Sequence, residues 1–168
     1  NYGSSGNYGT MHVPMEMLAA NAGASMTHVP FTGAAPAITA LLGGTLDAVA
    51  SGPSTVVQHV KAGKLRVLAN WGAERHPALP EVPTLRERGF AAEYAQWSGL
   101  FAPAGTPEPV LNVLRKAARD AQDDPAFKQA FVTLQTPLAY LDAPAFRQYW
   151  DADARKMAEV VQRIGKVE

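Results

Sequence analysis

The sequence of 168 residues contains no cysteine, carries no net charge and has no apolar run long enough to cross a membrane. The missing cysteines exclude thiolate catalysis, iron–sulfur clusters and cysteine zinc sites. Fifteen basic residues balance fifteen acidic ones, so no long-range field attracts nucleic acid or an anionic membrane. No signal peptide is predicted, and the opening residues are typical of the interior of a protein. We therefore expect processing or truncation upstream.

The first half of the chain alternates short apolar segments with helix-forming segments. Thr10 can cap the first predicted helix and Gly23 can end it. Alternation of strands and helices at this spacing is typical of right-handed crossovers in a parallel sheet, so the sequence predicts an α/β fold. The expected strands are residues 26–31, 46–51 and 65–72, and the expected helices are residues 10–22, 34–43 and 53–62.

The second half contains more predicted helix than strand. A long strand is expected at residues 94–103 and a short one at residues 138–141. The expected helices begin at Glu108, follow a break at residues 123–125, and span about residues 144–163. Their apolar faces need a sheet to cover them, and this segment offers too few strands. We expect the missing strands to come from absent sequence or from a second copy, which would make a homodimer.

The opening run NYGSSGNYGT is rich in glycine and has no charged side chain. A frayed terminus or an ordinary strand–helix turn would explain it. Alternatively, its backbone amides and the hydroxyls of Ser4, Ser5 and Thr10 could bind an anion at a helix N-terminus. A second loop of small residues at Gly33, Ala34 and Ala35 repeats the arrangement after the next predicted strand. Both loops would lie beyond the carboxyl ends of parallel strands, where ligands bind in open sheets.

Metal and catalytic sites are the weaker hypotheses. The four histidines have no metal-ligand spacing, so no metal and no cofactor are expected. His12 could donate to an anion, or it could be a surface or capping residue. Ser4 or Ser5 could be the nucleophile of a hydrolase, but the sequence has no GxSxG elbow. We therefore expect a binding protein and not an enzyme.

Five segments together resemble one family. They are YGSSGNYGTMH, HVPFTGAAPAITALLGGTLDA, VKAGKLRVLA, ERHPALPEVPTLRERGF and WSGLFAPAGTP. The chain is similar along essentially its whole length to the Bug/TctC family of periplasmic solute receptors for tripartite tricarboxylate transporters. The resemblance implies a type II periplasmic-binding-protein fold of two α/β lobes. Residues 1–93 would form one complete parallel-sheet lobe, and residues 94–168 would form the crossing strand and C-terminal helices of the other, incomplete lobe.

The resemblance also implies a ligand, partners and a site. The ligand would be a small di- or tricarboxylate, an acidic amino acid or an aromatic acid, and the partners would be membrane permease subunits, with no nucleic acid. A carboxylate-sensing domain that signals to a partner protein is the alternative. Many family members have one residue between the two loop glycines, whereas here Asn7 and Tyr8 both intervene, so Tyr8 is expected to project toward the ligand. The implied ligand-binding residues are Ser4, Ser5, Gly6, Tyr8, Thr10, His12, Thr32, Gly33, Ala34 and Ala35.

Overall fold

The computed structural model describes residues 1–165 of the chain. The chain folds into two compact units. One comprises Asn1–Gln96 and the chain from Met157 onward, and the other comprises Trp97–Lys156. The end of the chain thus groups with the first unit, which the division into residues 1–93 and 94–168 does not anticipate. That division stays a prediction about the lobes of the family, because compactness alone does not define a lobe.

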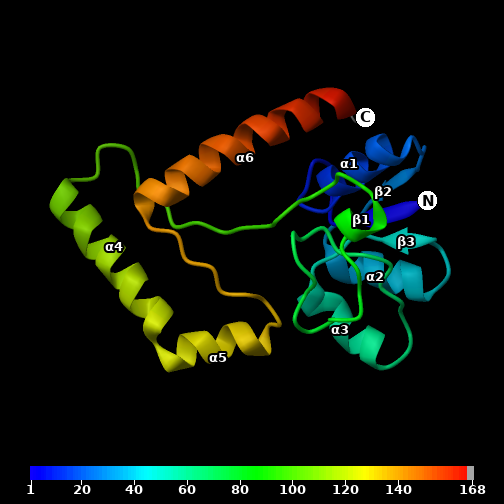
Figure 1. Ribbon diagram of the computed structural model, residues 1–168, viewed down its shortest axis with the longest axis horizontal. Helices are drawn as coiled ribbons and strands as arrows, with labels where there is room; N and C mark the ends of the chain where they lie inside the picture. Colours follow the sequence, from blue (N-terminus) through cyan, green and yellow to red (C-terminus); the bar gives the residue numbers. More distant parts are fainter. Residues whose placement is uncertain (166–168) are drawn as a thin grey trace. The chain divides into compact units, whose positions relative to one another are not determined.

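A parallel three-stranded sheet forms the centre of the first unit (Figure 1). Its strands are β1 (Tyr2–Ser4), β2 (His28–Pro30) and β3 (Ala48–Val49), in the order β2-β1-β3. β1 was not expected as a strand, since it is only three residues long and lies entirely within the glycine-rich run. Parallel pairing on both sides of β1 confirms the predicted α/β class.

The helices of the first unit follow the predicted pattern. Within Asn1–Gln96 they are α1 (His12–Ala22), α2 (Ala34–Leu42), α3 (Pro53–Lys61) and the short η1 (Arg86–Arg88). Gly23 ends α1 in the left-handed conformation, with φ at 60°. The predicted cap at Thr10 is wrong, because Met11 occupies the cap position and makes no side-chain bond. The Gly9 carbonyl instead accepts the amides of His12 and Val13, at 3.1 and 3.2 Å.

Helices cover both faces of this sheet, with α1 on one side and α2 and α3 on the other (Figure 1). Successive residues of a strand face opposite sides of the sheet, so Tyr2 faces one helix layer and Gly3 faces the other. Tyr2 packs with Met15 of α1, and both are buried. On the other face a Cβ at Gly3 would lie 2.5 Å from Leu46 Cδ1, so any larger residue there would displace the Leu46 side chain. The sheet is therefore the middle layer of an α/β/α unit.

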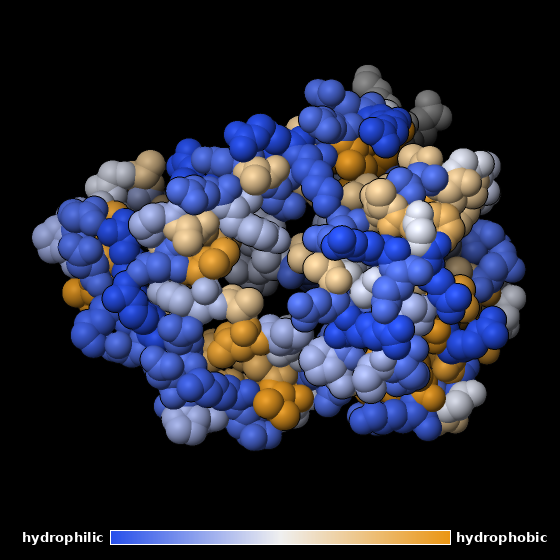
Figure 2. Space-filling model, viewed as in Figure 1, coloured by the Kyte–Doolittle hydropathy of each residue, from blue (hydrophilic) through white to orange (hydrophobic). Residues whose placement is uncertain are grey.

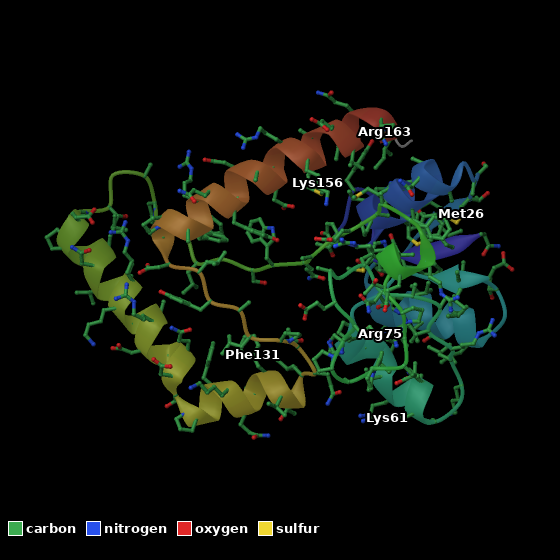
Figure 3. The ribbon with its side chains drawn as sticks, in the orientation of Figure 1. Met26, Lys61, Arg75, Phe131, Lys156 and Arg163 are labelled. Atoms are coloured by element: carbon green, nitrogen blue, oxygen red, sulfur yellow. The ribbon has the colours of Figure 1, made fainter. Side chains whose placement is uncertain are left out.

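The proline-rich segment after α3 is fixed by polar contacts. Arg75, labelled in Figure 3, donates from Nε to both carboxylate oxygens of Glu87 at 3.0 and 3.1 Å. Glu87 also accepts the Thr84 amide at 2.7 Å, and the Thr84 hydroxyl accepts the Glu87 amide at 3.1 Å. The Thr84 amide is the main cause of a lowered Glu87 pKa, and Arg75 adds to it. These contacts serve the fold and lie outside the predicted site.

Every regular element among the described residues of the second unit is a helix. The helices are α4 (Glu108–Asp123), α5 (Pro125–Thr133) and the first part of α6 (Ala143–Ile164). The predicted break at residues 123–125 is confirmed, and Asp124 caps α5 by accepting the Phe127 amide at 2.9 Å. Trp97 packs edge-on against Phe146, and its indole donates to Asp153 at 2.9 Å.

The predicted strands at residues 65–72, 94–103 and 138–141 are absent from the described chain. The first of them makes only a single parallel bridge, between Asn70 and Thr84. A strand needs a ladder of hydrogen bonds to a neighbour, and in the described residues single contacts such as the bond from the Tyr94 amide to the Trp71 carbonyl, at 2.9 Å, do not extend into one. Apolar side chains of α4 and α5 are accordingly exposed, and Figure 2 shows several over α5 as orange surface.

Candidate functional site

The candidate site lies at the carboxyl edge of the sheet, where three loops leave the strands. They are residues 5–11 after β1, residues 31–33 after β2, and residues 50–52 after β3. The chain leaves β1 for β2 on one side and returns to β3 on the other, so the topological switch point lies between β1 and β3. Ligands of open α/β sheets bind at such a switch point, so Ser51 and Gly52 in the loop after β3 join the candidate site. Sequence reasoning missed both because strand order cannot be read from strand spacing.

Backbone contacts bring these loops together. The Phe31 amide donates to the Ser4 carbonyl at 3.0 Å, and the Ala50 amide donates to the Gly3 carbonyl at 3.1 Å. A Cβ at Gly6 would lie 3.7 Å from the Phe31 carbonyl oxygen, so the first two loops are neighbours. Gly6 has φ at 129° and Gly33 has φ at 136°, a region that side chains other than glycine rarely adopt.

The first loop offers unpaired backbone donors. Within the part of the chain that the structure describes, the amides of Ser5, Asn7, Thr10 and Met11 have no acceptor. Unpaired amides at a helix N-terminus carry a partial positive charge and are suited to bind an anion. The first turn of α1 has no acidic residue to compete for that role. The loop can therefore bind a carboxylate without a charged side chain.

Ser4 lies beneath this loop with its side chain fully buried. Its hydroxyl oxygen is 3.2 Å from the Gly6 carbonyl oxygen and 2.7 Å from His28 Nε2. The Gly6 carbonyl can only accept, so we assign the one hydroxyl proton of Ser4 to that bond and a proton on Nε2 to His28. His28 then donates to Ser4, which is the reverse of a base that activates a nucleophile.

His12 occupies a second buried position, with 2% of its side chain exposed. Its Nδ1 accepts the Tyr8 amide at 2.9 Å, and its Nε2 lies 3.8 Å from Glu16 Oε1. Tyr2 donates from its hydroxyl to the same Glu16 oxygen at 2.6 Å. The His12 ring stacks on the ring of His28. The buried or partly buried side chains of His12, Glu16, Tyr2 and His28 thus form one polar cluster under the loop.

The electrostatics of this cluster favour neutral histidines. Burial lowers the pKa of His12, and the nearby Glu16 opposes that shift only in part. The pKa of His28 is lowered by burial first and then by the positive charge that His12 can carry. Burial, followed by the hydrogen bond to Glu16, raises the pKa of Tyr2. The two histidines and Tyr2 therefore support the loop as polar, uncharged groups at neutral pH.

Tyr8 lies at an exposed position of the first loop. Tyr8 is 40% exposed, adopts the left-handed conformation with φ at 54°, and donates from its hydroxyl to the Gly165 carbonyl at 2.5 Å. Its predicted projection toward the ligand stays a prediction.

The predicted site residues fall into two groups by exposure. Ser4 and His12 are buried under the loop, whereas the exposed or partly exposed positions are Ser5, Gly6, Tyr8, Thr10, Thr32, Gly33, Ala34 and Ala35.

The described residues show neither a metal cluster nor a membrane-spanning helix. They contain no cluster of three or more His, Asp or Glu side chains placed to hold a metal ion. None of their helices is long and apolar enough to cross a membrane.

A parallel sheet with uncharged donors gathered at its carboxyl edge is the arrangement in which open α/β sheets bind ligands. The sequence matches the family described as "Tripartite tricarboxylate transporter family receptor", TctC, over residues 1–166. The chain belongs to this family, as the resemblance of its motifs implies.

Known relatives agree with this assignment. A Cupriavidus necator protein, "UPF0065 protein in gbd 5'region", is 32% identical over 98% of this chain and 50% of its own length. A solved structure described as a periplasmic transporter is 31% identical, has a TM-score of 0.85, and aligns over 98% of this chain and 55% of its own. MatC from Rhodopseudomonas palustris, solved with bound malate, is 28% identical with a TM-score of 0.78 over 95% and 56%. The chain thus spans about half the length of these relatives.

Proposed function

We propose that this chain is the ligand-binding part of a periplasmic receptor that captures a small carboxylate. The receptor would deliver this ligand to the membrane permease of a tripartite tricarboxylate transporter. One observation carries the proposal: a glycine loop presents unpaired amides at the carboxyl edge of a parallel sheet. Membership of the receptor family and the malate bound by MatC support the choice of ligand class.

Binding would use backbone donors in both predicted loops. One carboxylate group would accept the amides of Ser5, Asn7 and Thr10, with the Ser5 hydroxyl adding a neutral donor. A second polar group of the ligand would face the N-terminus of α2 at Gly33. Neutral donors bind an anion less tightly than arginine does, and arginine is absent from these loops. Moderate affinity suits a receptor that must release its ligand to a permease.

The proposed binding cleft also needs a wall that faces these loops. Since the relatives are about twice as long as this chain, we propose that a second lobe supplies the facing wall of the cleft. The exposed apolar side chains of the second unit would pack against that lobe. Function as a receptor requires no chemical step, and the buried Ser4 supports a non-enzymatic role.

Titration calorimetry tests the proposal with malate and a panel of other dicarboxylates. It should be run on this chain and on a version extended to the length of the relatives. Binding by the extended protein, with exchange against other dicarboxylates, is the expected result. No heat from any carboxylate with the extended, folded protein would contradict the proposed ligand class.

A further inference from the structure

We propose that His12 is a positioning residue whose unprotonated Nδ1 holds the glycine loop in its anion-binding shape, so that protonation of His12 releases the loop. His12 is buried and its Nδ1 is already occupied, so it acts through the backbone of Tyr8 and not on the ligand. The inference rests on the proposed function only for its effect on ligand affinity. The effect on the loop itself can be measured without a ligand.

The loop is held from beneath at both ends. At one end His28 supports Ser4, whose hydroxyl donates to the Gly6 carbonyl at 3.2 Å. At the other end His12 accepts the Tyr8 amide at 2.9 Å. Tyr8 adopts a left-handed conformation that non-glycine residues rarely take, so an external contact must favour it. The bond to His12 is that contact on the backbone.

The same bond decides which amides face the ligand. The Tyr8 amide is turned inward to His12, whereas the amides of Ser5, Asn7 and Thr10 have no acceptor in the described chain. Without the inward bond, the backbone at Tyr8 loses that restraint, and the neighbouring amides are held less firmly. Preorganised donors bind an anion more tightly than donors that must be ordered on binding.

Protonation reverses the contact. A proton on Nδ1 would place two N–H donors against each other across 2.9 Å, and the hydrogen bond from Tyr8 would be lost. The titratable groups around His12 are Glu16 on α1, Tyr2 on β1, His28 on β2 and Tyr8 in the loop. Of these, Glu16 alone favours a charged His12, and its oxygen already accepts the Tyr2 hydroxyl. Burial lowers the pKa of His12, so the ring is neutral and the loop is held at neutral pH.

The first test uses the unmodified chain. Nitrogen-15 NMR would follow the His12 ring and the Tyr8 amide from pH 8 to pH 4.5, together with hydrogen exchange of that amide. We expect an unprotonated Nδ1 at pH 7 and a protected Tyr8 amide. Both signals should change with one midpoint, below the ordinary histidine value. A protonated Nδ1 at pH 7, or Tyr8 protection that persists after His12 has titrated, would overturn the proposal.

Matched variants separate positioning from packing. In His12→Asn the side-chain Oδ1 can replace Nδ1 as an acceptor that does not titrate, whereas His12→Leu has no acceptor. His12→Asn should keep the Tyr8 amide protected down to pH 5, and His12→Leu should lose protection at every pH. His28→Gln keeps a donor for Ser4 and should leave the His12 midpoint in place. Equal loss of protection in folded His12→Asn and His12→Leu would show that the ring is only packing.

The ligand arm compares the same variants at pH 7.5 with malate and the extended protein. We expect His12→Asn to bind within about twofold of the unmodified protein, and His12→Leu to bind roughly twofold to tenfold more weakly. If the unmodified protein binds no carboxylate, the proposed function fails, while the NMR result still decides the role of His12. Equal affinity for His12→Leu and the unmodified protein would remove His12 from the control of binding.

Discussion

The imidazole rings of His12 and His28 lie face to face, with 3.9 Å between their centroids and 8° between their planes. Two stacked imidazole rings repel each other if both are protonated to the cation. Burial already disfavours the charged form of either ring. The unfolded chain binds these protons near pH 6.5, the ordinary histidine value, whereas the folded chain binds them only at lower pH.

Stability should therefore fall on acidification. The free energy of unfolding should be level above about pH 7 and should decrease as the pH falls below about 6.5, since the unfolded state then binds more protons. Urea unfolding between pH 8 and pH 5 measures this, and the double variant His12→Asn, His28→Gln should show a shallower decrease. Greater stability at pH 5.5 than at pH 7.5 in the unmodified chain would contradict the assignment of neutral histidines.

Replacing Gly6 with valine should weaken ligand binding more than any single hydroxyl deletion. Gly6 has φ at 129°, and a branched side chain there would strain the loop and extend toward the Phe31 carbonyl. We expect a loss of at least about tenfold in affinity, measured by calorimetry with the best dicarboxylate. Gly23→Val is the control, because Gly23 also has positive φ but ends α1 in open space. Unchanged affinity in Gly6→Val would remove this loop from the site.

Replacing Ser5 with alanine should weaken carboxylate binding about twofold to tenfold, or roughly 0.5–1.5 kcal/mol, because it removes one neutral donor. Ser5 is exposed in the loop, whereas Ser4 is buried beneath it, so Ser4→Ala should mainly reduce stability. Turnover of simple esters provides a separate check. Hydrolysis that is abolished by Ser5→Ala or Ser4→Ala would favour the hydrolase hypothesis over a receptor.

Replacing Tyr2 with phenylalanine should cost about 1–3 kcal/mol of stability. The Tyr2 hydroxyl is buried and donates to Glu16 at 2.6 Å, so its loss leaves a partly buried carboxylate with one donor fewer. Tyr8→Phe is the matched control, because its hydroxyl donates to Gly165 at an exposed position. Urea unfolding at pH 7 should show a clearly larger loss for Tyr2→Phe, and equal losses would argue against the buried cluster.

The second unit should make this chain associate with itself when no other sequence covers it. Val113 on α4 is 68% exposed and Leu114 is 51% exposed, which leaves an apolar face in water. Analytical ultracentrifugation should show concentration-dependent association that Val113→Lys reduces and the exposed control Asn112→Lys does not. A monomer at all concentrations that binds no hydrophobic dye would contradict the expected missing cover.

Local sequence determined the helices and most of their ends. Gly23 ends α1 because its left-handed conformation closes the last turn. Asp124 caps α5, and Pro125 lacks the amide hydrogen that would continue α4, so the two helices are separate. These effects act within one turn of helix, so the sequence pattern alone carries them. The α/β class follows from the alternation of such segments in the first half of the chain.

Some local predictions failed where the deciding contact lies outside the segment. The predicted cap at Thr10 is wrong because the Gly9 carbonyl takes the first amides of α1. Residues 94–103 have the composition of a strand, but the bond from the Tyr94 amide to the Trp71 carbonyl, at 2.9 Å, does not extend into a ladder in the described chain. A strand forms only as one member of a ladder, so its own residues cannot specify it.

The sequence by itself identified the glycine loop and its family, since both depend on residues that are contiguous in the chain. Only the tertiary structure decided that His12 and His28 stack beneath that loop and that Ser4 is buried. It also added the loop after β3 to the site through the strand order. These relationships join residues from separate elements, and the packing of helices on a sheet sets them, which no local pattern in the sequence records.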